Sequence, residues 1–177
     1  MTINPPQPPI KTFSIERSAN VNEPINFTNI LFPVDLSDTA PKIVPYVTAV
    51  AERFQPEIHL LFVARTLEHF SSVQVPRHMI EEFQNRVVEG AQAELNLFKE
   101  KYFNKFIAGT KTAVILGDIS EEIINYVHTN NIDLIIMGTH GRKGLNKVFY
   151  GSIADRVIKS SEVPVLVVNP FKRKGYK

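Results

Sequence analysis

The chain has 177 residues, of which 44% are apolar and 21% are charged, as expected for one globular domain with a sizeable core. Its net charge of +2 does not require nucleic acid or a membrane surface as a partner, and the lack of cysteine excludes disulfides, thiolate metal sites and iron–sulfur clusters. No apolar run approaches the roughly 18 residues of a membrane-spanning helix, and the first residues do not resemble a secretory signal. We therefore expect a cytoplasmic protein.

Three zones of the chain differ in composition. Residues 1–28 form a proline-rich N-terminal arm, because proline fixes its own backbone and donates nothing to a strand ladder. We interpret this arm as a loose segment, with a proline-rich docking site as the alternative. Residues 29–169 alternate short apolar runs with helical patterns and are expected to form the folded domain. Residues 170–177 form a basic tail, which we expect to be solvated.

The first half of the domain predicts a strand, a helix and a second strand. The apolar run from Ile30 to Val34 predicts the first strand, and the run from Ile58 to Ala64 predicts the second. Between them, Ser37 or Asp38 is expected to cap a helix. Pro45 should kink this helix or delay its start.

The second half predicts a long helix with one apolar stripe, followed by three strands that alternate with helices. We expect Ser120 to cap the helix after the third strand. The predicted elements in chain order are a helix over Arg77–Phe106, a strand over Thr112–Leu116, a helix from Ser120 to Asn130, a strand over Ile132–Met137, a helix over 152–160 and a strand over Val163–Val168.

Five mostly unalternating apolar strands separated by helices indicate an α/β fold, with a parallel sheet covered by helices on both faces. Right-handed crossovers favour a single doubly wound domain. In such a fold, ligands bind beyond the carboxyl ends of the strands, where the strand order reverses.

A glycine-rich segment follows the fourth predicted strand, with the spacing Gly138-x2-Gly141-x9-Gly151-Ser152. Bare backbone N–H groups and the positive end of a helix dipole favour phosphate binding there. The spacing is neither a Walker A motif nor a dinucleotide fingerprint, and a flexible surface loop is the alternative. Asp35 ends the first strand and is expected beside Gly138. Its carboxylate could accept hydrogen bonds from ribose hydroxyls or orient a hydrated cation. The alternative is an acidic residue that the dipole favours at the start of a helix.

Residues 29–169 resemble a universal stress protein domain of the ATP-binding type. The glycine spacing matches the family's complete ATP-binding signature. The motifs that carry the resemblance are ILFPVD at 30–35, LLFV at 60–63, DLIIMGTHG at 133–141, Gly151-Ser152 and VPVLVV at 163–168.

The resemblance implies a five-stranded sheet of order 3-2-1-4-5 that binds ATP, or ADP or AMP, with Mg²⁺ on the nucleotide. By the same resemblance, the backbone of Val63 reads the adenine edge and Asp35 holds the ribose. His140 is interpreted as shaping the turn, and Arg142 either reaches the phosphates or is solvated. The residues expected at the cofactor site are Pro33, Val34, Asp35, Val63, Met137, Gly138, Thr139, His140, Gly141, Arg142, Gly151, Ser152 and Ile153.

The resemblance further implies a homodimer that pairs through the edge of the fifth strand, where Pro164 agrees with an edge position. We expect a regulatory or protective stress protein that binds an adenine nucleotide and at most hydrolyses it slowly. No catalytic residue is assigned, and the remaining histidines lack metal-ligand spacing. Protein partners are conceivable, and neither a membrane nor nucleic acid is expected as a partner. The alternatives are a nucleotide-independent interaction module of the same fold and an enzyme acting on nucleotides.

Overall fold

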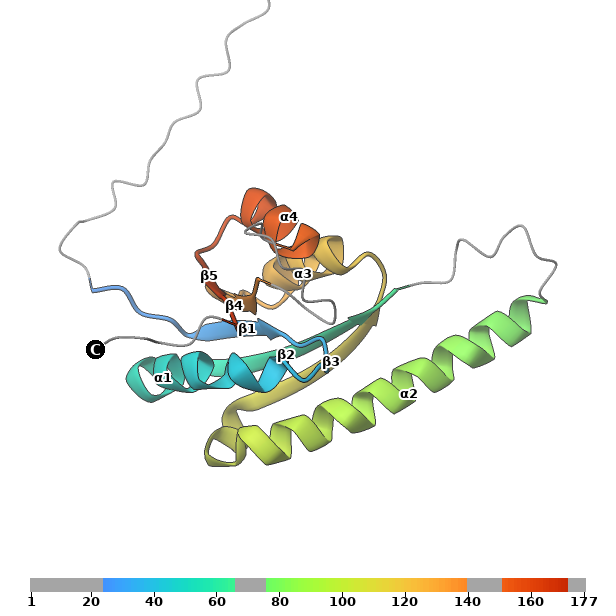
Figure 1. The fold of residues 1–177 in the computed structure, drawn as a ribbon, viewed down its shortest axis with the longest axis horizontal. Coiled ribbons are helices and arrows are strands. Elements are labelled where there is room, and N and C mark those ends of the chain that lie inside the picture. The colour runs from blue at the N-terminus through green and yellow to red at the C-terminus, as the bar shows by residue number, and fades with distance from the viewer. Residues whose placement is uncertain (1–23, 66–75, 140–150, 172–177) are drawn as a thin grey trace, which may run out of the picture.

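A five-stranded parallel sheet forms the centre of the molecule in a computed structural model, which describes residues 24–65, 76–139 and 151–171 (Figure 1). Neighbouring strands run parallel and lie in the order β3-β2-β1-β4-β5, which confirms the order that the resemblance implied. The strands are β1 (Asn29–Pro33), β2 (Glu57–Ala64), β3 (Thr110–Leu116), β4 (Leu134–Gly138) and β5 (Val165–Val168).

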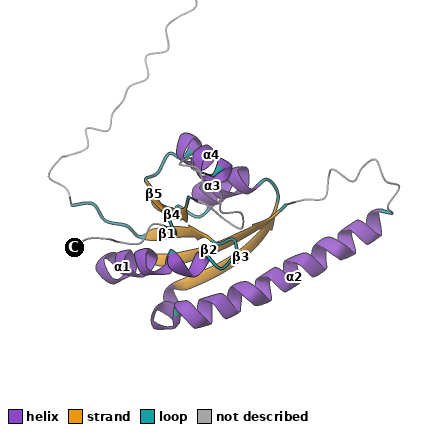
Figure 2. Ribbon diagram, viewed as in Figure 1, coloured by secondary structure: helices purple, strands orange, loops and turns teal. Residues whose placement is uncertain are grey.

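Helices cover both faces of this sheet, so the predicted doubly wound α/β architecture is confirmed (Figures 1 and 2). Helices α1 (Val44–Phe54) and α2 (Arg77–Tyr102) lie on one face. Helices α3 (Ile119–Thr129) and α4 (Ser152–Ser160) lie on the other. None of the helices in the described ranges is long and apolar enough to cross a membrane.

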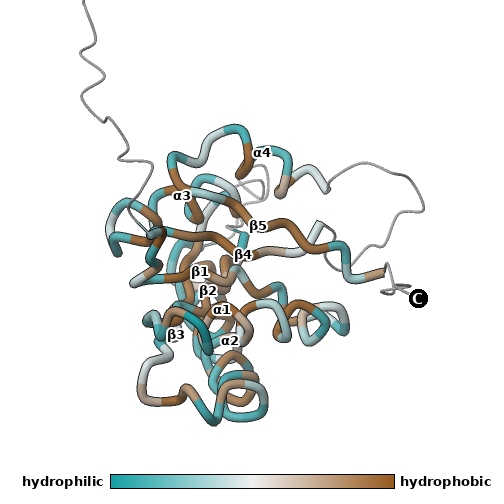
Figure 3. Tube along the Cα trace, turned by 90° about the vertical axis from the view of Figure 1, so that its left-hand side faces the viewer, coloured by the Kyte–Doolittle hydropathy of each residue, from teal (hydrophilic) through white to brown (hydrophobic). Residues whose placement is uncertain are grey.

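Successive side chains of the central strands enter two separate apolar cores. Phe32 of β1 packs with α1 and α2, whereas Leu31 and Ile135 pack with α3 and α4. The hydropathy trace accordingly shows apolar strands between two helical layers (Figure 3). Because both faces are buried, the central strands need apolar residues at every position, which explains the unalternating runs in the sequence.

The first helix begins later than the sequence indicated. Residues Ala40–Lys42 form a short 3-10 helix, and α1 starts at Val44 with Pro45 in its first turn. There the missing N–H of Pro45 removes no helical hydrogen bond, so the expected delay is confirmed. The predicted cap at Ser37 or Asp38 is wrong, because Ile43 occupies the N-cap position.

Helix α2 ends at Tyr102, four residues earlier than predicted, and a 3-10 helix over Asn104–Gly109 leads into β3. Its second half packs on the sheet through Leu95 and Phe98, which are buried. Its first half extends past the end of the sheet, and Phe83 is 52% exposed (Figure 1). The predicted stripe therefore contributes to the core along the second half of the helix.

The sequence predicts Ser120 as the N-cap of α3, but in the structure Asp118 caps this helix. The Asp118 carboxylate accepts hydrogen bonds from the backbone N–H groups of Ser120 (3.0 Å) and Glu121 (3.2 Å). The Ser120 hydroxyl donates to the same oxygen at 2.6 Å. Asp118 has the extended backbone of an N-cap residue, so the cap lies two residues earlier than predicted.

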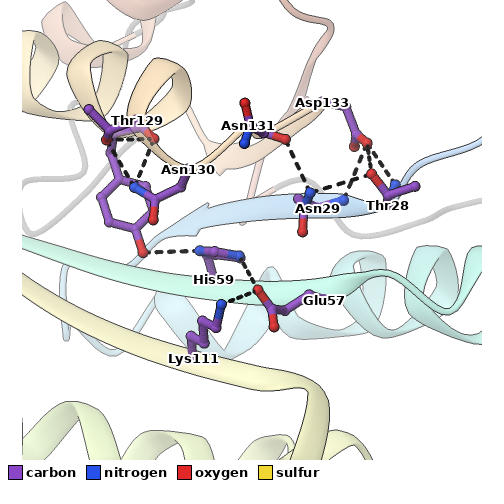
Figure 4. A network of polar contacts seen from close by, with 10 residues as sticks. Thr28, Asn29, Glu57, His59, Lys111, Thr129, Asn130, Asn131 and Asp133 are labelled. Atoms are coloured by element: carbon purple, nitrogen blue, oxygen red, sulfur yellow. Dashed lines mark hydrogen bonds and ion pairs between the residues drawn. The ribbon is translucent and has the colours of Figure 1, made fainter.

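Polar side chains cluster at the amino ends of the strands (Figure 4). The buried imidazole of His59 lies 2.8 Å from a Glu57 carboxylate oxygen through Nε2 and 3.0 Å from the Tyr126 hydroxyl through Nδ1. Lys111 Nζ lies 2.6 Å from the same Glu57 oxygen. A neutral imidazole that donates from Nε2 and accepts at Nδ1 satisfies both contacts. Burial lowers the pKa of His59, opposed by the Glu57 carboxylate and assisted by the Lys111 ammonium.

A second polar contact ties the segment before β1 to β4. Asp133 Oδ2 accepts hydrogen bonds from the Thr28 N–H (2.7 Å), the Thr28 hydroxyl (2.8 Å) and the Asn29 N–H (3.2 Å) (Figure 4). One carboxylate therefore joins two chain segments that lie about a hundred residues apart in the sequence.

We predict that the stability of the fold declines as the pH falls through about 6.5, the ordinary pKa of histidine. The folded-state pKa of His59 is lowered, so the unfolded chain binds the proton more readily, and acid favours unfolding. The melting temperature should fall between about pH 7.5 and 5.5, and His59→Gln should flatten this fall. His128→Gln is the control, because His128 is exposed on α3. An unchanged pH slope in His59→Gln would contradict the prediction.

Candidate functional site

The strand order reverses between β1 and β4, and this is where a doubly wound sheet opens a ligand site. The register pairs Ile30 with Leu134 and Leu31 with Ile135, so counting along both strands brings Asp35 level with Thr139. The chain then continues to α1 on one face of the sheet and to α4 on the other (Figure 1). Helices α1 and α4 therefore lie on opposite faces of the sheet, although they follow neighbouring strands.

On its other side, β1 is paired with β2. Pro33 is in register with Leu61, and the Val34 N–H donates to the Leu61 carbonyl at 2.8 Å. Two residues further along each strand, Asp35 comes level with Val63. The side chain of Val63 is buried in the core beneath α3 and serves the fold.

Val34 and Met137, two further predicted site residues, also have buried side chains. Val34 belongs to the core beneath α1, and Met137 belongs to the core beneath α4. Pro33 and Gly138 are half-buried at the ends of their strands. The structure therefore brings these four residues to the same edge, but the side chains of Val34 and Met137 serve the fold.

A tight turn after β1 fixes the carboxylate of Asp35. Its Oδ1 accepts hydrogen bonds from the Ser37 N–H (3.1 Å) and the Ser37 hydroxyl (2.7 Å), and that hydroxyl lies 2.8 Å from the Thr39 hydroxyl. The intervening Leu36 has a φ of 53°, a left-handed conformation that costs roughly 1–2 kcal/mol for a residue with a Cβ. The turn holds a charged group at the edge of the sheet at the expense of local backbone strain.

Two backbone hydrogen bonds hold the ends of the glycine-rich segment together. The Thr139 N–H donates to the Val168 carbonyl at 2.8 Å, and the Gly151 N–H donates to the Thr139 carbonyl at 2.7 Å. The start of α4 is thereby fixed beside the end of β4. The predicted site residues His140, Gly141 and Arg142 lie between these two anchors and outside the described residues.

Helix α4 starts without a side-chain cap. Its N-cap is Gly151, which has no side chain, and its first intrahelical bond runs from the Asp155 N–H to the Gly151 carbonyl at 3.0 Å. The N–H groups of Ser152 and Ile153 precede that bond and are directed beyond the helix N-terminus. Ser152 is exposed and Ile153 half-buried. This helix end suits an anion, because the first N–H groups of a helix have no partner within the helix and lie at the positive end of its dipole.

The carboxyl edge of the sheet therefore combines three kinds of group. Asp35 contributes a carboxylate held by Ser37, Val63 contributes its backbone, and Gly151 with Ser152 forms the start of α4. In the part of the chain that the structure describes, no group of three or more histidine, aspartate or glutamate side chains is arranged to hold a metal ion.

Sequence reasoning missed an ion pair that joins α3 to α4. Arg156 donates to both oxygens of Asp118, at 2.7 Å and 3.3 Å. The pKa of Asp118 falls to about 2, chiefly through the Ser120 hydroxyl, then through the Glu121 N–H and the Arg156 guanidinium. The Gly117-Asp118 turn marks the cap in the sequence, but no sequence signal places Arg156 beside it, 38 residues later.

The sequence model of the Universal stress protein family matches residues 26–169. The chain belongs to the universal stress protein family. Universal stress protein YxiE of Bacillus subtilis is 31% identical over 147 residues, which cover 80% of this chain and 99% of YxiE. Universal stress protein MJ0577 of Methanocaldococcus jannaschii is 31% identical over 163 residues, which cover 85% of this chain and 98% of MJ0577.

Solved structures of the family have the same fold. The structure of MJ0577 superposes with a TM-score of 0.71 at 30% identity, and the match covers 86% of this chain and all of that one. A universal stress protein in complex with cAMP gives a TM-score of 0.56 at 14% identity, with 82% and 99% of the two chains covered. The Archaeoglobus fulgidus protein in complex with dAMP gives 0.50 at 14% identity, with 82% and 100% covered. The last two comparisons show the fold alone.

Proposed function

We propose that this universal stress protein binds ATP at the carboxyl edge of its sheet and acts in the cytoplasm by regulatory or protective binding rather than by rapid turnover. The observation that carries the proposal is the start of α4, where Gly151 leaves the helix without a side-chain cap, directly beside the anchored end of β4. A phosphate would accept hydrogen bonds from the first N–H groups of this helix, and the helix dipole would stabilise its negative charge.

Adenosine is proposed to lie across β1 and β2. The Val63 backbone would pair with the adenine edge, and the Asp35 carboxylate, already oriented by Ser37, would accept hydrogen bonds from the ribose hydroxyls. The family structures in complex with cAMP and dAMP support an adenine nucleotide as the class of ligand.

The phosphates are proposed to lie against the N–H groups of Ser152 and Ile153, with Mg²⁺ carried on the phosphate oxygens. The glycine signature supports this placement through Gly141, which lies outside the described residues. ADP and AMP would use the same adenosine contacts and fewer phosphate contacts, so ATP is expected to bind most tightly of the three.

We predict that Gly151→Asp weakens Mg-ATP binding at least about tenfold by calorimetry without lowering the melting temperature. The backbone of Gly151 (φ −56°, ψ 149°) is open to any residue, and aspartate is a favourable N-cap, so the new carboxylate should stabilise α4. The same carboxylate would occupy the anion position and repel the phosphates.

Gly90→Asp is the matched control, because an added Cβ at Gly90, exposed on α2, meets no atom within 4 Å. It should bind Mg-ATP as the wild type does. Wild-type protein that gives no binding heat with Mg-ATP, or Gly151→Asp that binds it with unchanged affinity, would contradict the proposal.

We further propose that two copies of the chain pair through β5. This strand lies at the end of the sheet, and the carbonyl groups of Pro164 and Val168 point toward β4. Because backbone groups alternate in direction along a strand, those of Val165 and Val167 point to the open edge. Leu166 is 40% exposed on the same strand. Pairing of two such edges would satisfy the outward backbone groups and cover apolar surface.

We predict that the wild type elutes as a dimer, at twice its chain mass of 20.0 kDa, in size-exclusion chromatography with light scattering. Leu166→Lys should elute as a monomer, since a charge at the paired edge opposes association. Leu97→Lys introduces the same charge at an exposed leucine of α2 and should leave the dimer intact. A monomeric wild type, or a dimeric Leu166→Lys, would disprove the proposed interface.

A further inference from the structure

Helices α3 and α4 lie together on one face of the sheet and are joined by both apolar and polar contacts (Figure 1). On the apolar side, Ala154 and Val157 of α4 share a core with Ile123 of α3. On the polar side, Arg156 spans the two helices and holds both carboxylate oxygens of Asp118. The contact between Arg156 and Asp118 is directional, so it restricts rotation of α4 about its own axis. The packing of small apolar side chains is not directional and restricts this rotation less.

The position of Arg156 ties this contact to the proposed phosphate site. It lies one helical turn after Ser152, in a helix of nine residues. A helix this short has few contacts that set its tilt, so each one matters for the direction of its first N–H groups. The neighbouring pair of Lys159 with Asp155, at 2.8 Å, stays within α4 and sets no such orientation.

Asp118 is a rigid partner for this contact. Its carboxylate is already fixed by the Ser120 and Glu121 N–H groups and by the Ser120 hydroxyl. With a pKa of about 2 it stays charged at every pH at which the protein would work. The guanidinium of Arg156 meets it as a planar two-pronged donor, a geometry that restricts orientation more than a single-point contact does.

We propose that Arg156 is a positioning residue for ATP, which orients the N-terminus of α4 toward the phosphates by holding the helix to Asp118. This inference rests on the proposed nucleotide site and adds to it a side chain that does not itself reach the ligand. The pair connects the cap of one helix to the phosphate-binding end of the next.

The test compares ATP with adenosine, which lacks phosphates. By calorimetry, Arg156→Ala should weaken Mg-ATP binding about two- to fivefold, the upper part of the range expected for loss of one partly exposed ion pair, and should leave adenosine binding unchanged. Arg156→Lys should bind ATP more tightly than Arg156→Ala and less tightly than the wild type, since lysine keeps the positive charge but lacks the two-pronged guanidinium. Lys159→Ala, which breaks the pair within α4, should bind both ligands as the wild type does.

Asp118→Asn separates the ion pair from the helix cap, because asparagine is an equally good N-cap. It should weaken ATP binding, but by less than Arg156→Ala, because the oxygen that caps the helix still accepts from Arg156, and the double variant should lose no more than Arg156→Ala alone. This variant also keeps the test decisive if Arg156→Ala folds poorly.

Wild-type binding of ATP together with unchanged affinity in Arg156→Ala or Asp118→Asn would overturn the positioning role and leave the nucleotide site standing. Equal losses for ATP and adenosine would also overturn it, since they would indicate general loosening of the fold. Wild-type protein that binds neither ligand would overturn both proposals together.

Discussion

The structure depends on the burial of β1 between β2 and β4 with helices above and below it. Ile30, Leu31 and Phe32 are fully or almost fully removed from water, and their side chains alternate between the two cores. A parallel sheet buried in this way must send its connections to both faces, because an uncovered apolar face is unfavourable in water. That requirement places α1 on one face and α4 on the other, and the edge from which they diverge carries the candidate site.

The two ends of the sheet use polar groups differently. At the amino ends, Glu57 pairs with His59, and Asp133 Oδ2 accepts hydrogen bonds from Thr28 and Asn29, so these polar groups serve the fold (Figure 4). At the carboxyl ends, Asp35 is held in a strained turn, and α4 starts with a bare glycine. Strained turns and uncapped helix ends are costly in a purely structural role, and they are common where a ligand completes the site.

The sequence predicts the parallel sheet because apolar runs such as Ile58 to Ala64 are long, unalternating and bounded by polar turns. It also predicts that Asp35 and Gly138 come to the carboxyl ends of neighbouring strands, and the strand register brings them there. The sequence does not predict helix boundaries well, because several neighbouring polar residues can each serve as the N-cap. At α3 the cap is Asp118, two residues before the predicted Ser120, because Asp118 has the extended backbone that an N-cap requires. The sequence also fails for Arg156, since an ion pair across two helices depends on packing angles that no local pattern encodes.

The central proposal is that an adenine nucleotide lies across the carboxyl edge, with its ribose on Asp35 and its phosphates on α4. Titration of Mg-ATP into ¹⁵N-labelled protein, followed by amide chemical shifts in NMR, tests this placement most directly. We expect the largest shifts at the amides of Asp35, Val63, Gly151 and Ser152, while the amide of Asn29, at the opposite edge, stays unshifted. Saturating ATP that shifts none of these four amides, or that shifts mainly residues at the amino ends of the strands, would contradict it.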